Sequence, residues 1–202
     1  MPAAGPGIEI SVVIPTRGDV DMTPILAKLG DYPEVREALV VTGDSVFNRY
    51  RGVKQARYDV IYTQDDDCIT DLRPLIDAYR PGVVVNAMTP MHAENYRGRI
   101  TLVGFGAIFD SSLIQVLDGW EQDEFFLREA DRVFTALNPH VTVFPEIQIL
   151  PCASAENRLW RQADHIARFM EIEKRINRFN VAQALHSGVD WTVARVDAAV
   201  PA

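Results

Sequence analysis

Strand-like and helix-like patterns alternate along the first half of this sequence, and that alternation constrains the fold more than any other feature. Short β-branched and apolar runs predict strands over Ile8–Ile14, Ala38–Thr42 and Asp59–Thr63. Helical spacing over Met22–Leu29 and Asn48–Arg57 predicts a helix in each gap between them. A β-α-β-α order of this kind predicts an α/β fold, with a mainly parallel sheet flanked by helices in a single domain.

The second half of the chain continues the mixed pattern with weaker signals. Glu124–Leu137 has apolar residues at helical spacing and predicts an amphipathic helix. Ile100–Phe109 is strand-like although it contains two glycines, and Thr89–Gly98 is a polar stretch without a clear pattern. The remaining predicted elements are helices over Asp71–Tyr79, Ser111–Leu117 and Ala155–Phe179, and extended segments over Val83–Val85 and His140–Leu150.

Composition argues against several classes of protein. Of the 202 residues, 48% are hydrophobic and 24% are charged, a balance typical of a globular domain. The 20 basic and 28 acidic residues give a net charge of −8, so we do not expect a non-specific nucleic-acid binder or a polybasic membrane binder. A local basic pocket for a phosphorylated small molecule is compatible with this charge.

Cysteine use and the N-terminal sequence predict the location of the protein. Two cysteines, Cys68 and Cys152, cannot form a disulfide framework or a Cys-only zinc site. Met1–Gly7 lacks the basic and then apolar pattern of a signal peptide, and no apolar run approaches the ~20 residues of a membrane helix. We therefore expect a cytoplasmic protein without an integral membrane segment.

Polar segments follow the three predicted strands of the first half. They are Pro15 with the residues after it, Gly43-Asp44, and Asp65–Asp67. In a mainly parallel sheet the carboxyl ends of the strands lie along one edge, and ligands bind there. The sequence therefore predicts that the three segments meet at a ligand site.

The acidic triplet Asp65-Asp66-Asp67 is the strongest candidate for binding a metal. In an extended segment residues i and i+2 point the same way, so Asp65 and Asp67 share a side and Asp66 faces the other. Adjacent carboxylates repel one another unless a cation or water compensates them. Two carboxylates suit a hard cation such as Mg²⁺ or Mn²⁺. The alternative is a solvated acidic turn, but the position at the ligand edge favours the cation.

Five short segments occur in a characteristic order along the chain. They are Ser-Val-Val-Ile-Pro-Thr at 11–16, Asn-Arg-Tyr-Arg-Gly at 48–52, the Asp triplet, Gly-Phe-Gly-Ala-Ile-Phe at 104–109, and Glu-Ala-Asp at 129–131. This order resembles nucleotide-sugar glycosyltransferases of the GT-A fold. The first and fourth segments are similar to the large inverting family that includes cellulose and chitin synthases, and the second and third also resemble exostosin-type transferases.

The resemblance implies a site for a nucleoside-diphosphate sugar, with UDP as the expected nucleotide and Mn²⁺ or Mg²⁺ as the cofactor. It implies that Asp65 lies near the ribose and Asp67 binds the metal, with Asp65 as a further ligand. His165, or alternatively His186, would complete the metal site. The other donor-binding residues that it implies are Pro15, Thr16, Arg17, Asp44, Arg49, Asp66, Gly106 and Arg168. Of these, Arg49 and Arg168 are the candidates for binding phosphate, because the planar guanidinium suits that group.

Glu129 and Asp131 are the candidate catalytic carboxylates. They flank the apolar stripe of the predicted helix Glu124–Leu137, and we expect neither on its buried face. In inverting GT-A enzymes a carboxylate near the start of such a helix takes the proton of the acceptor hydroxyl. The resemblance gives this role to Asp131, with Glu129 in reserve. The alternative is a charged first turn stabilised by the helix dipole.

The expected protein is thus a metal-dependent glycosyltransferase that transfers a sugar to an acceptor hydroxyl, with inversion and retention both open. We expect residues 1–7 to be a flexible segment and residues 8–154 to be the GT-A core. Within the core, residues 8–80 would bind the nucleotide sugar and residues 81–154 would serve the acceptor and catalysis. Residues 155–202 would form a helical segment that closes the site.

Two other functions remain open at this stage. The first is a nucleotidyltransferase of related fold, although the Pro15–Asp19 segment has only one glycine and one arginine for holding a triphosphate. The second is a non-catalytic module that binds nucleotide or metal. It is motivated by Ala130, where the resembled family has a glutamate, and by Thr42-Gly43 in a position that is usually acidic.

Overall fold

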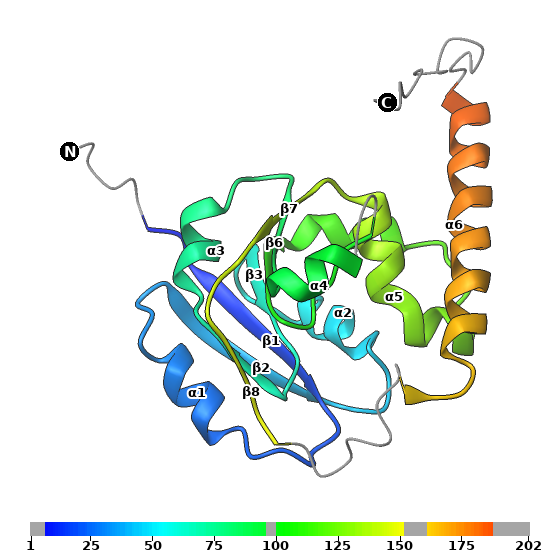
Figure 1. Cartoon of the computed structure of the whole chain (residues 1–202). Coiled ribbons are helices and arrows are strands. Elements are labelled where there is room, and N and C mark those ends of the chain that lie inside the picture. The colour runs from blue at the N-terminus through cyan, green and yellow to red at the C-terminus, as the bar shows by residue number, and fades with distance from the viewer. Residues whose placement is uncertain (1–6, 96–99, 152–160, 188–202) are drawn as a thin grey trace, which may run out of the picture.

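Six strands make the central sheet of the protein, whose computed structural model describes residues 7–95, 100–151 and 161–187 (Figure 1). In spatial order they are β2 (Val35–Thr42), β1 (Ile10–Thr16), β3 (Val60–Thr63), β6 (Ala107–Asp110), β5 (Val84–Ala87) and β7 (His140–Val143). β6 runs antiparallel to both of its neighbours, and the other adjacent pairs are parallel. This mixed, mainly parallel sheet confirms the predicted α/β fold class.

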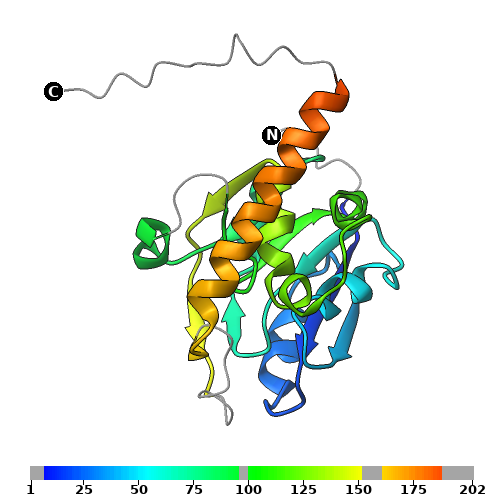
Figure 2. The same cartoon turned by 90° about the vertical axis from the view of Figure 1, so that its right-hand side faces the viewer.

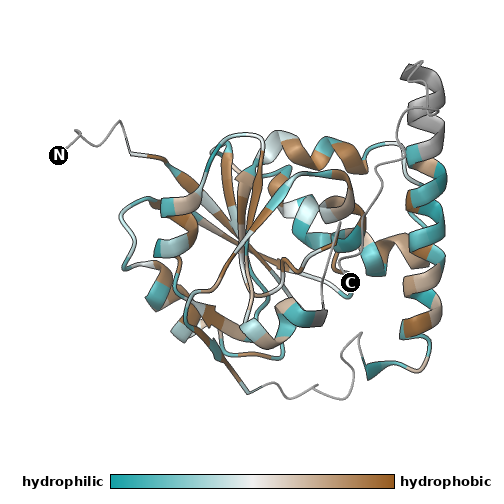
Figure 3. Ribbon diagram, turned by 45° about the horizontal axis from the view of Figure 1, so that its top comes forward, coloured by the Kyte–Doolittle hydropathy of each residue, from teal (hydrophilic) through white to brown (hydrophobic). Residues whose placement is uncertain are grey.

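Helices cover both faces of the sheet. α1 (Thr23–Leu29) and α3 (Arg73–Ala78) lie on one face, and α2 (Asn48–Val53), the 3₁₀ helix η1 (Ser111–Leu117) and α5 (Glu124–Leu137) lie on the other. Because side chains alternate along a strand, β1 serves both cores. Its Ile10, Val12 and Ile14 pack toward α1 and α3, while Val13 packs toward α2 and α5. Figure 3 shows the resulting concentration of hydrophobic residues on the central strands.

The long helix α6 (His165–Ser187) packs against α5 and crosses it in the view of Figure 2. Ile172 and Ile176 are buried in the same core as the apolar face of α5. This contact adds a further layer outside α5 and fixes the position of that helix. Among the described residues, no helix combines the length and the apolar character that crossing a bilayer requires.

Element boundaries differ from the predictions in four places. The polar stretch at 89–98 contains a helix, α4 (Pro90–Asn95), and the strand predicted over 100–109 is limited to β6. A second sheet has two strands: β4 (Cys68–Thr70), which directly follows the Asp triplet, pairs with β8 (Ile147–Ile149). The helix predicted over 155–179 begins at residue 165, and residues 152–160 lie outside the described part of the chain.

Candidate functional site

The segments that follow β1, β2 and β3 meet at one edge of the sheet, as the sequence predicted. Strands β1, β2 and β3 are parallel neighbours, so their carboxyl ends share that edge. The Gly43 amide donates to the Thr16 carbonyl at 2.9 Å, which joins the ends of β1 and β2. The Thr16 hydroxyl donates to the Asp66 carboxylate at 2.6 Å, which joins the end of β1 to the segment after β3.

The Asp triplet forms the turn between β3 and β4, and burial alternates along its three side chains. Asp66 is buried with 4% exposure and is bound by Thr16, whereas Asp65 and Asp67 are only partly buried. Burial alternates along the triplet, but Asp66 and Asp67 lie in a turn and not in the extended segment that the prediction assumed. The Asp65 amide donates to the Gly104 carbonyl at 2.7 Å, and the Asp67 carbonyl accepts from the Leu150 amide at 2.7 Å, so both flanks of the turn are fixed. Asp66 therefore holds the loop together, and Asp65 and Asp67 remain partly exposed.

Arg49 lies in α2 and is the most deeply buried charge of the site, with 1% exposure. Its Nη2 contacts Asp65 Oδ1 at 2.6 Å, its Nε lies 3.3 Å from Asp131 Oδ1, and its Nη1 donates to the Thr63 hydroxyl at 3.2 Å. Burial alone would lower the pKa of Arg49, but the carboxylates of Asp131 and Asp65 outweigh that effect and raise it. Instead of the phosphate that the sequence suggested, the partners of Arg49 are two carboxylates and a hydroxyl.

Asp131, the expected base, lies on α5 beside Arg49 and is 23% exposed at its side chain. The Tyr50 hydroxyl donates to Asp131 Oδ1 at 2.8 Å, so Tyr50 and Arg49 both contact the same oxygen. Burial raises the pKa of Asp131; Arg49 and the Tyr50 hydrogen bond act against this shift, and the charges of Asp65 and Glu129 add to it. A partly exposed carboxylate with a raised pKa suits proton transfer.

Glu129 was expected off the buried face of its helix, and this expectation was wrong. It is 5% exposed, and its carboxylate pairs with Arg132 Nε at 2.6 Å and with Arg168 Nε at 3.2 Å. Its φ of −119° and ψ of 16° interrupt the helical geometry inside α5. Helical spacing alone did not show this, because an arginine of α6 folds over the charged side of α5 and buries Glu129.

The predicted phosphate ligand Arg168 is the α6 partner in this ion pair. Its side chain is 2% exposed, and besides Glu129 it contacts Gln162 at 3.1 Å and pairs with Asp164. Carboxylates already surround its guanidinium, so Arg168 joins α6 to α5.

The three metal ligands suggested by the sequence do not converge. Across residues 7–95, 100–151 and 161–187, no three His, Cys, Asp or Glu side chains are placed to hold one ion, so Asp65, Asp67 and His165 do not form a joint site. His165 begins α6, and its buried Nδ1 lacks a hydrogen-bond partner. The alternative, His186, lies where only the backbone of α6 is described. The spacing of residues in the sequence could not reveal where α6 would start.

Two glycines before β6 fit closely against the site for different reasons. A Cβ on Gly104 would lie 2.4 Å from Asp65 Oδ2, so the absence of a side chain there leaves room for the carboxylate. Gly106 has a φ of 130°, and a Cβ there would lie 2.8 Å from the Tyr62 hydroxyl. Backbone conformation and packing thus account for Gly106, whereas Gly104 shapes the site.

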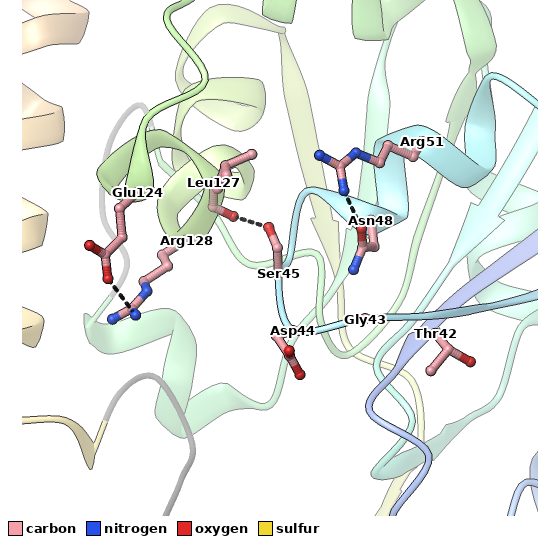
Figure 4. Close-up of a pocket in the computed structure, with 9 residues that line it drawn as sticks. All are labelled: Thr42, Gly43, Asp44, Ser45, Asn48, Arg51, Glu124, Leu127 and Arg128. Carbon is pink, nitrogen blue, oxygen red and sulfur yellow. Dashed lines mark hydrogen bonds and ion pairs between the residues drawn. The ribbon is translucent and has the colours of Figure 1, made fainter.

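A pocket of about 420 Å³ opens at the carboxyl end of β2 (Figure 4). It contains Asp44, which the sequence assigned to the nucleotide, and it also contains Asn48 and Arg51 from α2. The Ser45 hydroxyl donates to the Leu127 carbonyl at 2.6 Å, which ties the β2–α2 loop to α5. The lining residues are Thr42, Gly43, Asp44, Ser45, Asn48, Arg51, Glu124, Leu127 and Arg128.

Sequence reasoning missed several residues of this region. The α5 side of the pocket was not foreseen, because the contact between α5 and the β2–α2 loop spans distant parts of the sequence. Tyr50 was missed although it adjoins Arg49. Of the remaining predicted residues, Pro15 lies near the end of β1, and Arg17 directly follows that strand. Both are partly buried at the same edge of the sheet.

Comparison with known proteins shows what the fold resembles. No family model matches the sequence, and no curated protein matches it. The structure is similar to the mannosyltransferase PcManGT from Pyrobaculum calidifontis in complex with GDP-Man and Mn²⁺, with a TM-score of 0.54 and 16% identity over 83% of this chain. This chain spans 64% of the length of that protein.

A second similar structure is S. aureus TarS in complex with UDP-GlcNAc, with a TM-score of 0.44 and 14% identity, covering 67% of this chain and 56% of that one. The mannosyltransferase shows that the protein has a fold shared with glycosyltransferases.

Proposed function

We propose that the protein is a metal-dependent glycosyltransferase that moves a sugar from a nucleoside-diphosphate sugar, with UDP as the expected nucleotide, to an acceptor hydroxyl. One observation carries the proposal: Arg49 contacts both Asp65 after β3 and Asp131 on α5. From the sequence, Asp65 was assigned to the donor and Asp131 to the acceptor. In the structure the Arg49 guanidinium contacts both carboxylates. The fold shared with a GDP-Man-bound mannosyltransferase supports the same interpretation.

The donor would lie along the edge formed by β1, β2 and β3. Its base would enter the pocket that contains Asp44, and its ribose would approach Asp65. Asn48 and Arg51 offer polar groups at that pocket, where the Arg51 Nη1 donates to Asn48 Oδ1 at 2.9 Å. A pocket with a few convergent polar groups is the usual form of a site for a small ligand.

The divalent cation would be held by Asp67 together with the donor diphosphate. Asp65 and Asp67 are both partly exposed, and Asp65 Oδ1 is engaged by Arg49, so we assign the ion to Asp67. Mg²⁺ and Mn²⁺ sites of this kind use one or two carboxylates and complete their shell with phosphate and water, so the residues present fit such an ion. When bound, the ion would offset the negative charge of the departing nucleoside diphosphate.

Asp131 would act as the general base through Oδ2, because Oδ1 already accepts from Tyr50 and faces Arg49. The bond between sugar C1 and the β-phosphate oxygen breaks, and its electron pair leaves with the nucleoside diphosphate. The acceptor oxygen forms the new bond to C1, and its proton passes to Asp131. This single displacement inverts the configuration at C1, and such base assistance typically contributes ~10²- to 10⁴-fold to the rate.

Turnover of nucleoside-diphosphate sugars tests the proposal. With Mn²⁺ and a panel of UDP- and GDP-sugars, the wild-type protein should release nucleoside diphosphate slowly even without acceptor, and Asp67→Ala should abolish the release. Asp131→Asn should keep the hydrolysis but lower transfer to an acceptor by ~10²- to 10⁴-fold. Asp77→Asn, at an exposed site on α3, is the matched control and should behave as wild type.

A non-catalytic module that binds nucleotide and cation is the second candidate. The observation that favours it is the Arg49–Asp65 pair, which neutralises one acid of the triplet without any metal. Such a module would bind nucleoside diphosphate and Mn²⁺ and gain thermal stability from them. The complete absence of donor hydrolysis and of sugar transfer, together with this binding, would replace the enzyme proposal by the module.

A further inference from the structure

Arg49 does more than neutralise the charge of two carboxylates. The role inferred for it below rests on the proposed function. We infer that Arg49 is a positioning residue that holds the donor-side carboxylate Asp65 and the base Asp131 in a fixed relation. The two acids come from different parts of the fold, the turn after β3 and the middle of α5. Within the described residues, Arg49 is the side chain that contacts both of them directly.

The guanidinium group is itself fixed to the sheet. Its Nη1 donates to the Thr63 hydroxyl, and that hydroxyl donates to the Val13 carbonyl of β1 at 2.7 Å. Because the group is planar and rigid, fixing Nη1 also sets the directions of Nη2 and Nε. Asp65 and Asp131 then contact different nitrogens of one rigid plane.

Burial makes this arrangement costly to abandon. A guanidinium with 1% exposure cannot reach bulk water, so its charge depends on the two carboxylates. The neighbouring arginine of α2, Arg51, is exposed and contacts Asn48 instead. The buried position therefore marks Arg49 as the residue that spans the site, while Arg51 faces the pocket.

A lysine could keep the charge but could not reproduce this geometry. An ammonium is a single point of charge, whereas Arg49 uses separate nitrogens for Asp65, Asp131 and Thr63. Loss of the planar group should let the two acids move independently. A displacement of about 1 Å in a reacting group can cost on the order of 10²-fold in rate.

The experiment compares Arg49→Lys and Arg49→Ala with Lys54→Met, a matched control at an exposed position just after α2. Donor KM and transfer kcat are measured for each, with thermal unfolding to confirm folding. Both Arg49 variants should lose on the order of 10²-fold in kcat and raise donor KM, whereas Asp131→Asn should lower kcat alone. Methylguanidinium in the buffer should restore part of the activity of Arg49→Ala but not of Asp131→Asn. Wild-type kcat and donor KM in Arg49→Lys would overturn the inference.

A readout independent of turnover separates this inference from the proposed function. Carboxyl-carbon NMR resonances at fixed pH should move for both Asp65 and Asp131 in Arg49→Lys. In Tyr50→Phe only Asp131 should respond, because Tyr50 hydrogen-bonds to that acid and not to Asp65. An unmoved Asp65 resonance in Arg49→Lys would refute the positioning role even if the protein turned over no donor. If the resonances move as expected and no donor is hydrolysed, the proposed function fails, whereas the positioning of Asp65 and Asp131 by Arg49 stands.

Discussion

Replacing Gly104 by alanine should impair the site while leaving the fold nearly intact. The added Cβ would lie 2.4 Å from Asp65 Oδ2 and 3.1 Å from its carboxyl carbon, whereas ordinary contacts begin at 3.4 Å. The carboxylate must therefore move by about 1 Å, away from the position in which Arg49 Nη2 binds it. Movement of this size in a site group costs on the order of 10²-fold in rate.

The stability of Gly104→Ala should change little. The Asp65 side chain is 41% exposed, so it can turn toward solvent without opening a cavity. Alanine also restricts the unfolded chain, which contributes roughly 0.4–1 kcal/mol in favour of folding where the backbone is compatible. The weakened Arg49–Asp65 pair opposes this gain, but Arg49 keeps Asp131 and Thr63 as partners. We therefore expect a change in the free energy of unfolding within about 1 kcal/mol.

The assay pairs urea unfolding with kcat/KM for donor hydrolysis. Gly7→Ala is the control, because no atom lies within 4 Å of a Cβ added there. Gly104→Ala should unfold near the wild-type midpoint and lose on the order of 10²-fold in kcat/KM. Wild-type kcat/KM in this variant would refute the reasoning, since it would show that the position of Asp65 does not matter for the donor.

Four further predictions address stability and pH. Arg168→Met should lower the free energy of unfolding by about 3 kcal/mol, measured by urea denaturation, because it leaves Glu129 buried with one arginine fewer. The transfer rate should rise with pH through an apparent pKa above the usual ~3.9 of aspartate, because Asp131 must be ionised to act and its pKa is raised; this limb should vanish in Asp131→Asn. The same raised pKa favours the folded state at low pH, and that contribution should fade as pH rises through the pKa of the folded protein. Thr16→Val should cost roughly 1.5–3 kcal/mol in thermal or urea unfolding, because it removes the 2.6 Å hydrogen bond to buried Asp66; an unchanged midpoint would contradict this.

Patterns local to the sequence predicted much of the fold. β1, β3 and α5 follow directly from β-branched runs and from helical spacing, and the parallel order of β1, β2 and β3 placed three loops at one edge. The position of the Asp triplet just after β3 also followed from the sequence pattern. Each of these features depends on near neighbours in the chain.

Features that depend on distant contacts were missed. The burial of Glu129 and Arg168 arises where α6 crosses α5, and no spacing within either helix indicates that contact. The partners of Arg49 lie 16 and 82 positions further along the chain, so the sequence suggested an external phosphate where the fold supplies internal carboxylates. β4 was missed because it has only three residues and is stabilised by pairing with β8, which lies within the extended segment predicted over His140–Leu150.

Calorimetric titration of nucleoside diphosphates in the presence and absence of Mn²⁺ tests the central claim most directly. The claim is that the carboxylates after β3 form a binding site for a cation and a diphosphate. We predict that UDP or GDP binds the wild-type protein only with Mn²⁺, and that Asp67→Ala removes the binding while Asp77→Asn retains it. Failure of both nucleotides to bind in the presence of Mn²⁺, or equal binding by Asp67→Ala, would contradict the account.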